Sequence, residues 1–305
     1  MMRRAGVLVV SVLLALLTGC EPGDGDAVAT PTSTVPGLEA HTDVLELVRA
    51  ADDAAKRRGT ALFALSDGGA IHGDGDALPR PDGAPHPGAA PRKPIGAGRL
   101  AYRDGGVDIL VRTLQREENI EFRAVGDAVF VQPIGRLVPI ARGMPWVRLA
   151  AMVRRPLPRI LGPEMVHAPS IVDPTHTFDL LVAAGTIVSS ERAMLGDTKV
   201  TQYDIELDIE RLAEHIRLSS AGQPRAALLT ALRTLVDQGT TTAPVTLLLD
   251  RHDLPRRVRL LNIAALPTRG PDAEDLPMLT VNYRDWGKPV AVAPPPPGSV
   301  ATVPR

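Results

Sequence analysis

The residue with the most distinctive chemistry is Cys20, whose sulfur is the only thiol in the 305-residue sequence. With a single cysteine, the rest of the chain has no means to form a disulfide, a thiolate zinc site or a cysteine nucleophile. Any chemistry beyond Cys20 must therefore come from hydroxyl, imidazole, acidic or basic side chains.

The hydroxyl and imidazole side chains do not follow a catalytic pattern. The sequence contains no G-x-S-x-G, and the pairs Ser189–Ser190 and Ser219–Ser220 lack its strand–turn–helix context. It contains no H-E-x-x-H either, and Glu214–His215 is expected on the solvated face of a helix. We therefore predict a protein without enzymatic activity. The alternative is an envelope hydrolase in which polar side chains from distant segments converge in one cleft.

Three further motifs resemble binding sites and have simpler explanations. Gly96–Ala101 matches the G-x-G-x-x-A pattern of dinucleotide sites, but a Pro-rich loop precedes it and a strand is expected to follow. Gly73–Ala77 repeats Gly23–Ala27 and lacks the closing Glu of a calcium-binding EF-hand, so we predict a hydrophilic insertion. His167 and His176 could meet across a Pro-rich turn, but we expect no metal or cofactor there.

The N-terminus carries the features of an export signal. Arg3 and Arg4 precede an apolar run, Ala5–Leu17, which small residues follow. A spanning helix needs about 20 apolar residues, so this run is too short to cross a membrane. The pattern predicts a segment that directs export and is then removed.

The four residues Leu17-Thr18-Gly19-Cys20 end this signal and resemble a bacterial lipobox. The resemblance implies that residues 1–19 are a lipoprotein signal peptide, that the Cys20 thiol is diacylated, and that Cys20 becomes the first residue of the mature protein. An ordinary signal peptide with an incidental cysteine is the alternative. Lipidation would hold the protein on the extracytoplasmic face of the cell membrane.

Composition limits the remaining function classes. The net charge is −1 and aromatic residues make up 3% of the chain, so neither a basic surface nor a stacking platform for nucleic acid is expected. Residues 20–37 are rich in Gly, Asp, Pro, Ser and Thr, which predicts a flexible tether. Residues 289–305 include four consecutive prolines, which predicts an extended tail that does not pack.

The segment between tether and tail, residues 38–288, is predicted to form one domain. A first helix is expected over His41–Arg58, capped by Thr42 or Asp43 and ended by Gly59. Asp173 is a candidate cap for a second helix over Pro174–Ala184, and two more are expected over Ile209–Leu218 and Pro224–Gln238. Residues 67–94 and 154–167 are expected to be loops.

Strands are predicted from alternating apolar and polar residues and from Gly-containing turns. The expected strands are 60–66, 99–103, 107–112, 119–125, 128–132, 144–149, 186–192, 198–208, 243–250, 256–266 and 278–283. Asp204, Glu206 and Asp208 fall on the wet side of one of them, which explains their spacing without catalysis. Successive strands with few helices between them predict an α+β fold with one large, curved antiparallel sheet.

The second half of the chain resembles a family of cell-surface lipoproteins. The stretches Val200–Ala213, Val245–Val258 and Leu279–Val290 follow one another as they do in the LppX/LprG-type lipoproteins of mycobacteria and related actinobacteria, and more distantly in the lipoprotein carrier LolA. The resemblance implies a half-barrel, in which a strongly curved antiparallel sheet has helices packed on its concave face around an apolar cavity. It also implies a lipid or glycolipid ligand. It identifies no ligand-binding residue.

These observations lead to two hypotheses. The first is a membrane-anchored lipoprotein that binds or carries an apolar ligand in the cell envelope. Its predicted helices are rich in Leu, Val and Ala, whose side chains offer an acyl chain no hydrogen bonds. Burial of each methylene group of such a chain would contribute about 0.8 kcal/mol to binding. The second is a structural or regulatory envelope module with a filled core, which acts through protein contacts. The same residues fit either hypothesis, so the volume and lining of the space between sheet and helices distinguish the two.

Overall fold

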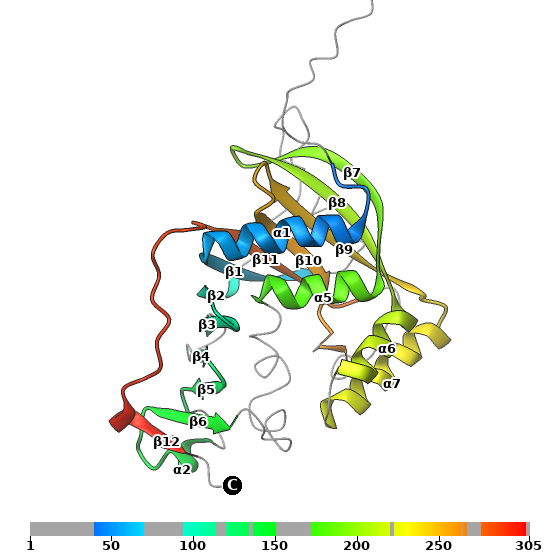
Figure 1. Ribbon diagram of the computed structural model, residues 1–305. Helices are drawn as coiled ribbons and strands as arrows, with labels where there is room; N and C mark the ends of the chain where they lie inside the picture. The colour runs from blue at the N-terminus through cyan, green and yellow to red at the C-terminus, as the bar shows by residue number, and fades with distance from the viewer. Residues whose placement is uncertain are drawn as a thin grey trace, which may run out of the picture. The chain divides into compact units, whose positions relative to one another are not determined.

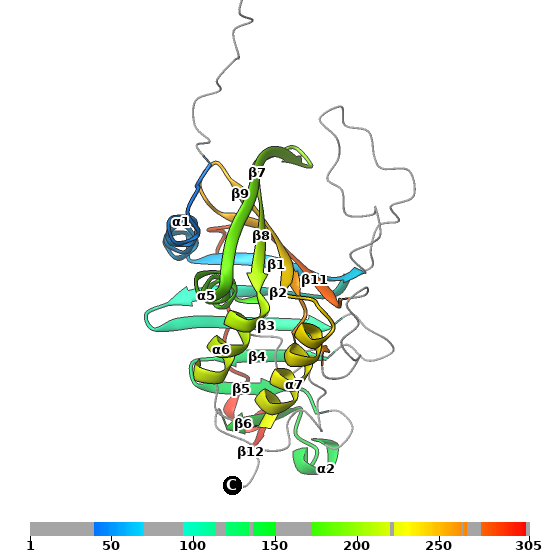
Figure 2. The ribbon, with the colours of Figure 1, turned by 90° about the vertical axis from the view of Figure 1, so that its right-hand side faces the viewer.

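A computed structural model describes residues 40–69, 94–113, 120–133, 137–150, 172–219, 223–263, 265–266 and 276–302. Residues from Gly37 onward form one compact unit. Figures 1 and 2 show its long sheet and the helices that lie against it.

The sheet contains twelve strands in the order β12-β6-β5-β4-β3-β2-β1-β11-β10-β9-β8-β7. Neighbouring strands are antiparallel, except that β12 runs parallel to β6. The strands are β1 (Thr60–Gly69), β2 (Pro94–Arg103), β3 (Gly106–Thr113), β4 (Glu121–Val125), β5 (Ala128–Val131), β6 (Trp146–Ala150), β7 (Gly185–Leu195), β8 (Thr198–Asp208), β9 (Thr242–Asp250), β10 (Pro255–Leu261), β11 (Met278–Arg284) and β12 (Val300–Thr302). Pairing of β1 with β11 joins the first half of the chain to the second.

Five α-helices accompany the sheet in the described part of the chain: α1 (Val44–Arg58), α2 (Val138–Ala141), α5 (Pro174–Ala184), α6 (Ile209–Ser219) and α7 (Gln223–Asp237). α1 and α5 lie side by side and pack against β1, β7 and β8, within the curve of the sheet (Figure 1). α6 and α7 pack against each other and connect β8 to β9 along the chain. The open, curved antiparallel sheet with helices on its concave side confirms the predicted fold class.

The first helix illustrates why these segments fold as they do. Asp43 caps α1, because one of its carboxylate oxygens accepts hydrogen bonds from the backbone N–H groups of Leu45 (2.8 Å) and Glu46 (3.0 Å). Gly59 ends it with a left-handed φ of 76°. One face of α1 is fully buried and joins a single apolar core with α5, α6, α7 and the sheet. The structure thus selects Asp43 from the two predicted caps.

The prediction that residues 289–305 do not pack is wrong at their far end. A 3₁₀ turn, η3 (Pro297–Ser299), leads into β12, and Val300 pairs with Trp146 of β6. Upstream, the Arg123 guanidinium donates a hydrogen bond to the Ala293 carbonyl (3.0 Å) and stacks over the Trp146 ring at 4.5 Å. The prolines forbid a helix, but they leave the residues after them free to add a strand to the edge of the sheet.

Other differences concern the ends of elements. β1 continues to Gly69, so the loop predicted over residues 67–94 starts later than expected. β2 begins at Pro94, before the predicted start of that strand at residue 99. β10 ends at Leu261, five residues before the predicted end of that strand. The Asp/Gly repeat at 73–77 and the loop predicted at 154–167 lie outside the described residues.

Candidate functional site

Strand register places one row of apolar residues across the concave face. Phe63, Gly98, Val111, Phe122, Val131 and Val147 are successive cross-strand partners from β1 to β6. The five side chains in this row are each 2% exposed or less. Because side chains alternate between the two faces of a strand, neighbours two residues away, such as Leu100 and Ile109, widen the same apolar surface.

The row continues through the other half of the sheet. Leu65 of β1 pairs with Val281 of β11, which pairs in turn with Val258 of β10. Val258 pairs with Leu247 of β9, and Leu247 pairs with Tyr203 of β8. We call the surface formed by this row and the preceding one the apolar concave face. It extends over β1–β6 and β8–β11 and belongs to one buried cluster.

Gly98 is a point at which the backbone of β3 and the Phe63 ring lie close against β2. A Cβ at residue 98 would lie 1.9 Å from the Leu110 carbonyl oxygen and 2.6 Å from the Phe63 Cζ atom. The missing side chain therefore gives the Phe63 ring room to lie across β2. This glycine belongs to the G-x-G-x-x-A match, which lies within strand β2 and therefore lacks the strand–turn–helix context of a dinucleotide site.

A small polar cluster interrupts the apolar concave face at the start of α5. Asp173 caps α5, as predicted, by accepting a hydrogen bond from the Thr175 backbone N–H (2.9 Å). The Tyr283 hydroxyl donates to the Val172 carbonyl (3.0 Å). The hydroxyl groups of Tyr102 and Thr175 are buried beside each other and beside the Asp173 carboxylate, close enough for Thr175 to affect the pKa values of both neighbours through side-chain hydrogen bonding. Two hydroxyl groups are thus held inside an otherwise apolar region.

Burial dominates the electrostatics of this polar cluster. It raises the pKa of the Asp173 carboxyl, against the opposing effect of the hydrogen bond from the Thr175 backbone. It also raises the pKa of the Tyr102 hydroxyl, and the nearby Asp173 carboxylate adds to that effect. The pKa of His176 is lowered by burial, although Asp173 and Asp179 oppose the change. Each of these groups is therefore shifted toward its neutral form, which suits an apolar surrounding.

The remaining residues singled out from the sequence do not converge on this cluster. Asp204 and Asp208 are half-buried and Glu206 is exposed, as predicted for the wet side of β8. Asp208 accepts a hydrogen bond from the Arg211 backbone N–H (2.9 Å), so it caps α6. Glu214 forms an ion pair with Arg217 on the exposed side of α6.

The metal and membrane expectations are tested only in part. Among the described residues, no group of three or more His, Cys, Asp or Glu side chains is placed to hold a metal ion. His167 lies outside the described residues, so the pair with His176 stays untested. Cys20 lies outside them as well. Within the described part of the chain, no helix is both long and apolar enough to span a bilayer.

Sequence reasoning missed the polar cluster because its members come from distant parts of the chain. Tyr102 and Tyr283 lie on β2 and β11, which flank β1 in the sheet. The signal in the sequence was the alternation of side chains along a strand. Tyr102 is two residues from Leu100, and Tyr283 is two residues from Val281, so each tyrosine lies on the same face as a buried apolar residue. Only the pairing order of the strands brings the two tyrosines to the same region.

Comparisons with known proteins give similarity at the level of the fold. No family model matches the chain, and no curated protein matches it. Among solved structures, the Mycobacterium tuberculosis lipoprotein LppX is 12% identical with a TM-score of 0.39, covering 82% of this chain and 98% of its own. LprF from Mycobacterium bovis is 10% identical with a TM-score of 0.40, covering 82% and 97%. LppX is of the type that the sequence resembles, but similarity this low carries no information on ligands or residue roles.

Proposed function

We propose that this protein is a lipoprotein of the cell envelope, anchored through acylated Cys20, whose apolar concave face binds or carries an apolar ligand such as a lipid or glycolipid. The role is binding, without catalysis. The anchor would place the domain on the extracytoplasmic face of the cell membrane, next to the acyl chains of the membrane lipids.

The observation that carries this proposal is the continuity of the apolar concave face. Register aligns methyl and phenyl groups from β1–β6 and β8–β11 into one surface, and the described helices pack mainly against β1, β7 and β8. Such a surface offers an acyl chain no competing hydrogen bonds, and burial of each methylene is worth about 0.8 kcal/mol. The buried hydroxyl groups of Tyr102 and Thr175 form one polar point on this face, beside which an ester or hydroxyl of the ligand would lie.

Ligand content can be measured together with a filling substitution. We expect organic extraction and mass spectrometry of the purified full-length Cys20→Ala protein to recover a lipid, since this variant carries no acyl chain of its own. Val131→Phe adds volume on the apolar concave face and should lower the lipid recovered per protein by at least half. Val188→Phe is the matched control, because Val188 is 60% exposed on β7. Its lipid content should equal that of the parent.

The second hypothesis, a module that acts through protein contacts, is favoured by one observation. The side chains of the apolar concave face are already close to fully buried without a ligand, from β1 to β6 as well as from β8 to β11, as in a filled core. A filled core predicts that Val131→Phe is overpacked and loses about 1–3 kcal/mol of stability. It also predicts no extractable lipid and a protein partner in cross-linking. Finding this combination would reject the carrier proposal.

A further inference from the structure

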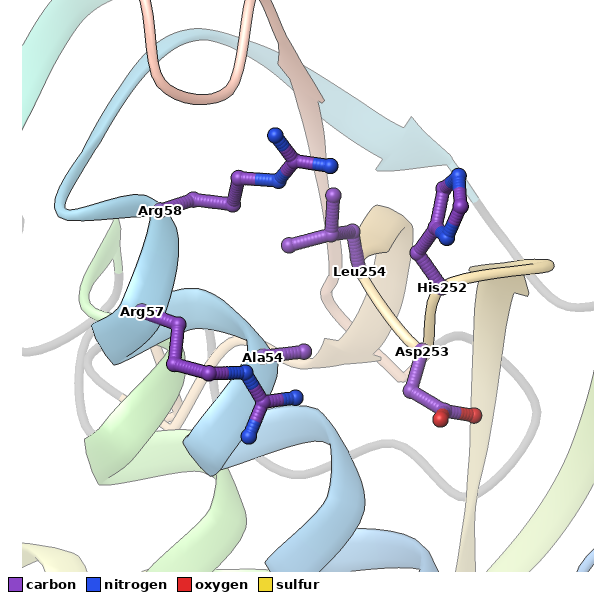
Figure 3. A pocket seen from close by; sticks show the side chains of 6 residues that line it. All are labelled: Ala54, Arg57, Arg58, His252, Asp253 and Leu254. Atoms are coloured by element: carbon purple, nitrogen blue, oxygen red, sulfur yellow. The ribbon is translucent and has the colours of Figure 1, made fainter.

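An open depression lies between the last turn of α1 and the turn that joins β9 to β10. Its volume is about 430 Å³. Figure 3 shows the arrangement, with Arg57 and Arg58 on the α1 side and His252 and Asp253 on the turn. Ala54 and Leu254 complete the lining. We call this feature the basic depression.

The basic depression has an excess of positive charge. Arg57 and Arg58 are exposed, and neither forms an ion pair among the described residues. The Asp253 carboxylate lines the same depression, and its Oδ1 atom lies 3.2 Å from the His41 Nε2 atom, a contact that is an ion pair only when His41 is protonated. The nearby Asp250 is buried and engaged by Arg256 at 2.5 Å. Within the described part of the chain, two guanidinium groups therefore face solvent without an acidic partner.

The turn beside the arginines is fixed in its conformation. The Asp250 carboxylate accepts hydrogen bonds from the backbone N–H groups of His252 (2.8 Å) and Leu254 (3.2 Å). The Arg251 Nε–H group donates to the His252 Nε2 atom (3.2 Å), which adds a third exposed guanidinium next to the depression. Guanidinium groups on the α1 side and beside the turn suit phosphate, whose oxygens accept several hydrogen bonds at once.

The basic depression lies beside the start of the domain. Besides its contact with Asp253, His41 donates a hydrogen bond from its backbone N–H to the Tyr203 hydroxyl (3.1 Å). The chain from Cys20 thus enters the domain beside the wall of the depression. The 19 residues between Cys20 and Ala40 span at most about 65 Å when fully extended. A bilayer holding the acylated cysteine therefore stays within reach.

We propose that the basic depression binds the phosphate of anionic phospholipid headgroups and so turns this side of the domain toward the membrane. The idea rests on the proposed anchor only for proximity, since the tether would keep the headgroups at a high local concentration. Each arginine near an anionic surface contributes about a fivefold gain in binding, so a weak site suffices once the protein is tethered. An anchored carrier would gain a preferred orientation in which to exchange its ligand.

The test uses the full-length Cys20→Ala protein, so that acylation cannot dominate. Its sedimentation with vesicles of phosphatidylcholine alone is compared with that of vesicles containing about one-third phosphatidylglycerol, at low and high salt. We expect stronger binding to the anionic vesicles, and we expect salt to weaken it. Arg57→Gln/Arg58→Gln should lower this preference by about 25-fold.

The matched control is Arg49→Gln/Arg233→Gln, which removes the same charge from exposed positions outside the depression. This pair should retain most of the preference for anionic vesicles. Equal losses in both pairs would show general attraction by net charge and overturn the site, as would the absence of any preference in the parent. Circular dichroism of both double variants establishes that they are folded. Lipid extraction and Cys20 acylation are measured separately, so failure here does not depend on the carrier proposal.

Discussion

Gly98 is the residue at which a single added methyl group should matter most. The backbone of β3 and the Phe63 ring already occupy the space that a Cβ would need. We expect Gly98→Ala to lower the free energy of unfolding by about 3 kcal/mol, the upper end for overpacking, because a strand backbone cannot move aside easily.

Urea denaturation measures this effect, and Gly106→Ala provides the control. Gly106 begins β3 without a positive φ, and apart from its two chain neighbours no described residue has an atom within 4 Å of the place that an added methyl group would take. Its substitution should change stability by less than about 0.5 kcal/mol. Equal midpoints for the two variants would contradict the close approach of Phe63 and β3.

Glu121 should make stability depend on pH at the acid end. Its side chain is 7% exposed, and its carboxylate lies 2.5 Å from an Arg112 nitrogen and 2.6 Å from an Arg123 nitrogen. Burial alone would raise the pKa of this carboxyl, but the hydrogen bonds from Arg112 and Arg123 outweigh it and the pKa is lowered. A lowered folded-state pKa stabilises the fold above the unfolded value of about 4.3, and this contribution is lost as pH falls further.

Glu121→Gln should therefore cost about 1–2 kcal/mol at pH 7, because Arg112 is exposed and its share is screened. The difference from the parent should shrink as the pH falls below about 4.3. Denaturant titrations at several pH values measure this trend. Glu191→Gln, at an exposed position of β7, should show little effect at any pH. A difference that stays constant down to a pH of about 3, well below the unfolded pKa, would argue against an ionised Glu121 in the fold.

Among the elements, β12 shows how the end of the chain protects an edge of the sheet. Without it, β6 would expose unpaired backbone groups and the cluster of Ala128, Phe130 and Trp146 would lose its contact with Val300. We expect a chain truncated after Ala293 to exchange the amide hydrogens of β6 faster.

Hydrogen exchange followed by mass spectrometry supplies its own control for this truncation. Peptides covering β9, which lies between β8 and β10, should keep their protection in the truncated chain. Faster exchange throughout the molecule would mean that β12 stabilises the whole domain. Unchanged exchange in β6 would mean that the parallel pairing adds nothing.

In the molecule as a whole, the tether and the domain have separate tasks. The domain from Gly37 onward is compact with its own core, so loss of the anchor should not unfold it. We expect Cys20→Ala protein to appear in the soluble envelope fraction or the medium, whereas the parent stays with the membrane. Cell fractionation with immunoblotting measures this. Ser33→Ala, a substitution within the tether that leaves the thiol in place, is the control. Retention of Cys20→Ala in the membrane would refute anchoring through this residue.

The elements could be predicted from local pattern to a large extent. The cap at Asp173, the α5 and α7 spacing and the wet side of β8 follow from periodicity and capping chemistry, which act within a few residues. The tail illustrates the limit. Its prolines argue correctly against a helix, but whether Val300–Thr302 finds a partner depends on β6, about 150 residues earlier.

Local sequence was enough to establish the α+β class, the helix boundaries near their caps, and the single thiol on which the anchoring proposal rests. The strand order emerges only in three dimensions, where it joins β1 to β11 and so merges two apolar patterns into one concave face. The same is true of the closeness of Tyr102 to Tyr283, and of Arg57 and Arg58 to His252. This division arises because local preferences act along the chain, whereas pairing between distant strands is fixed by burial of the whole apolar face at once.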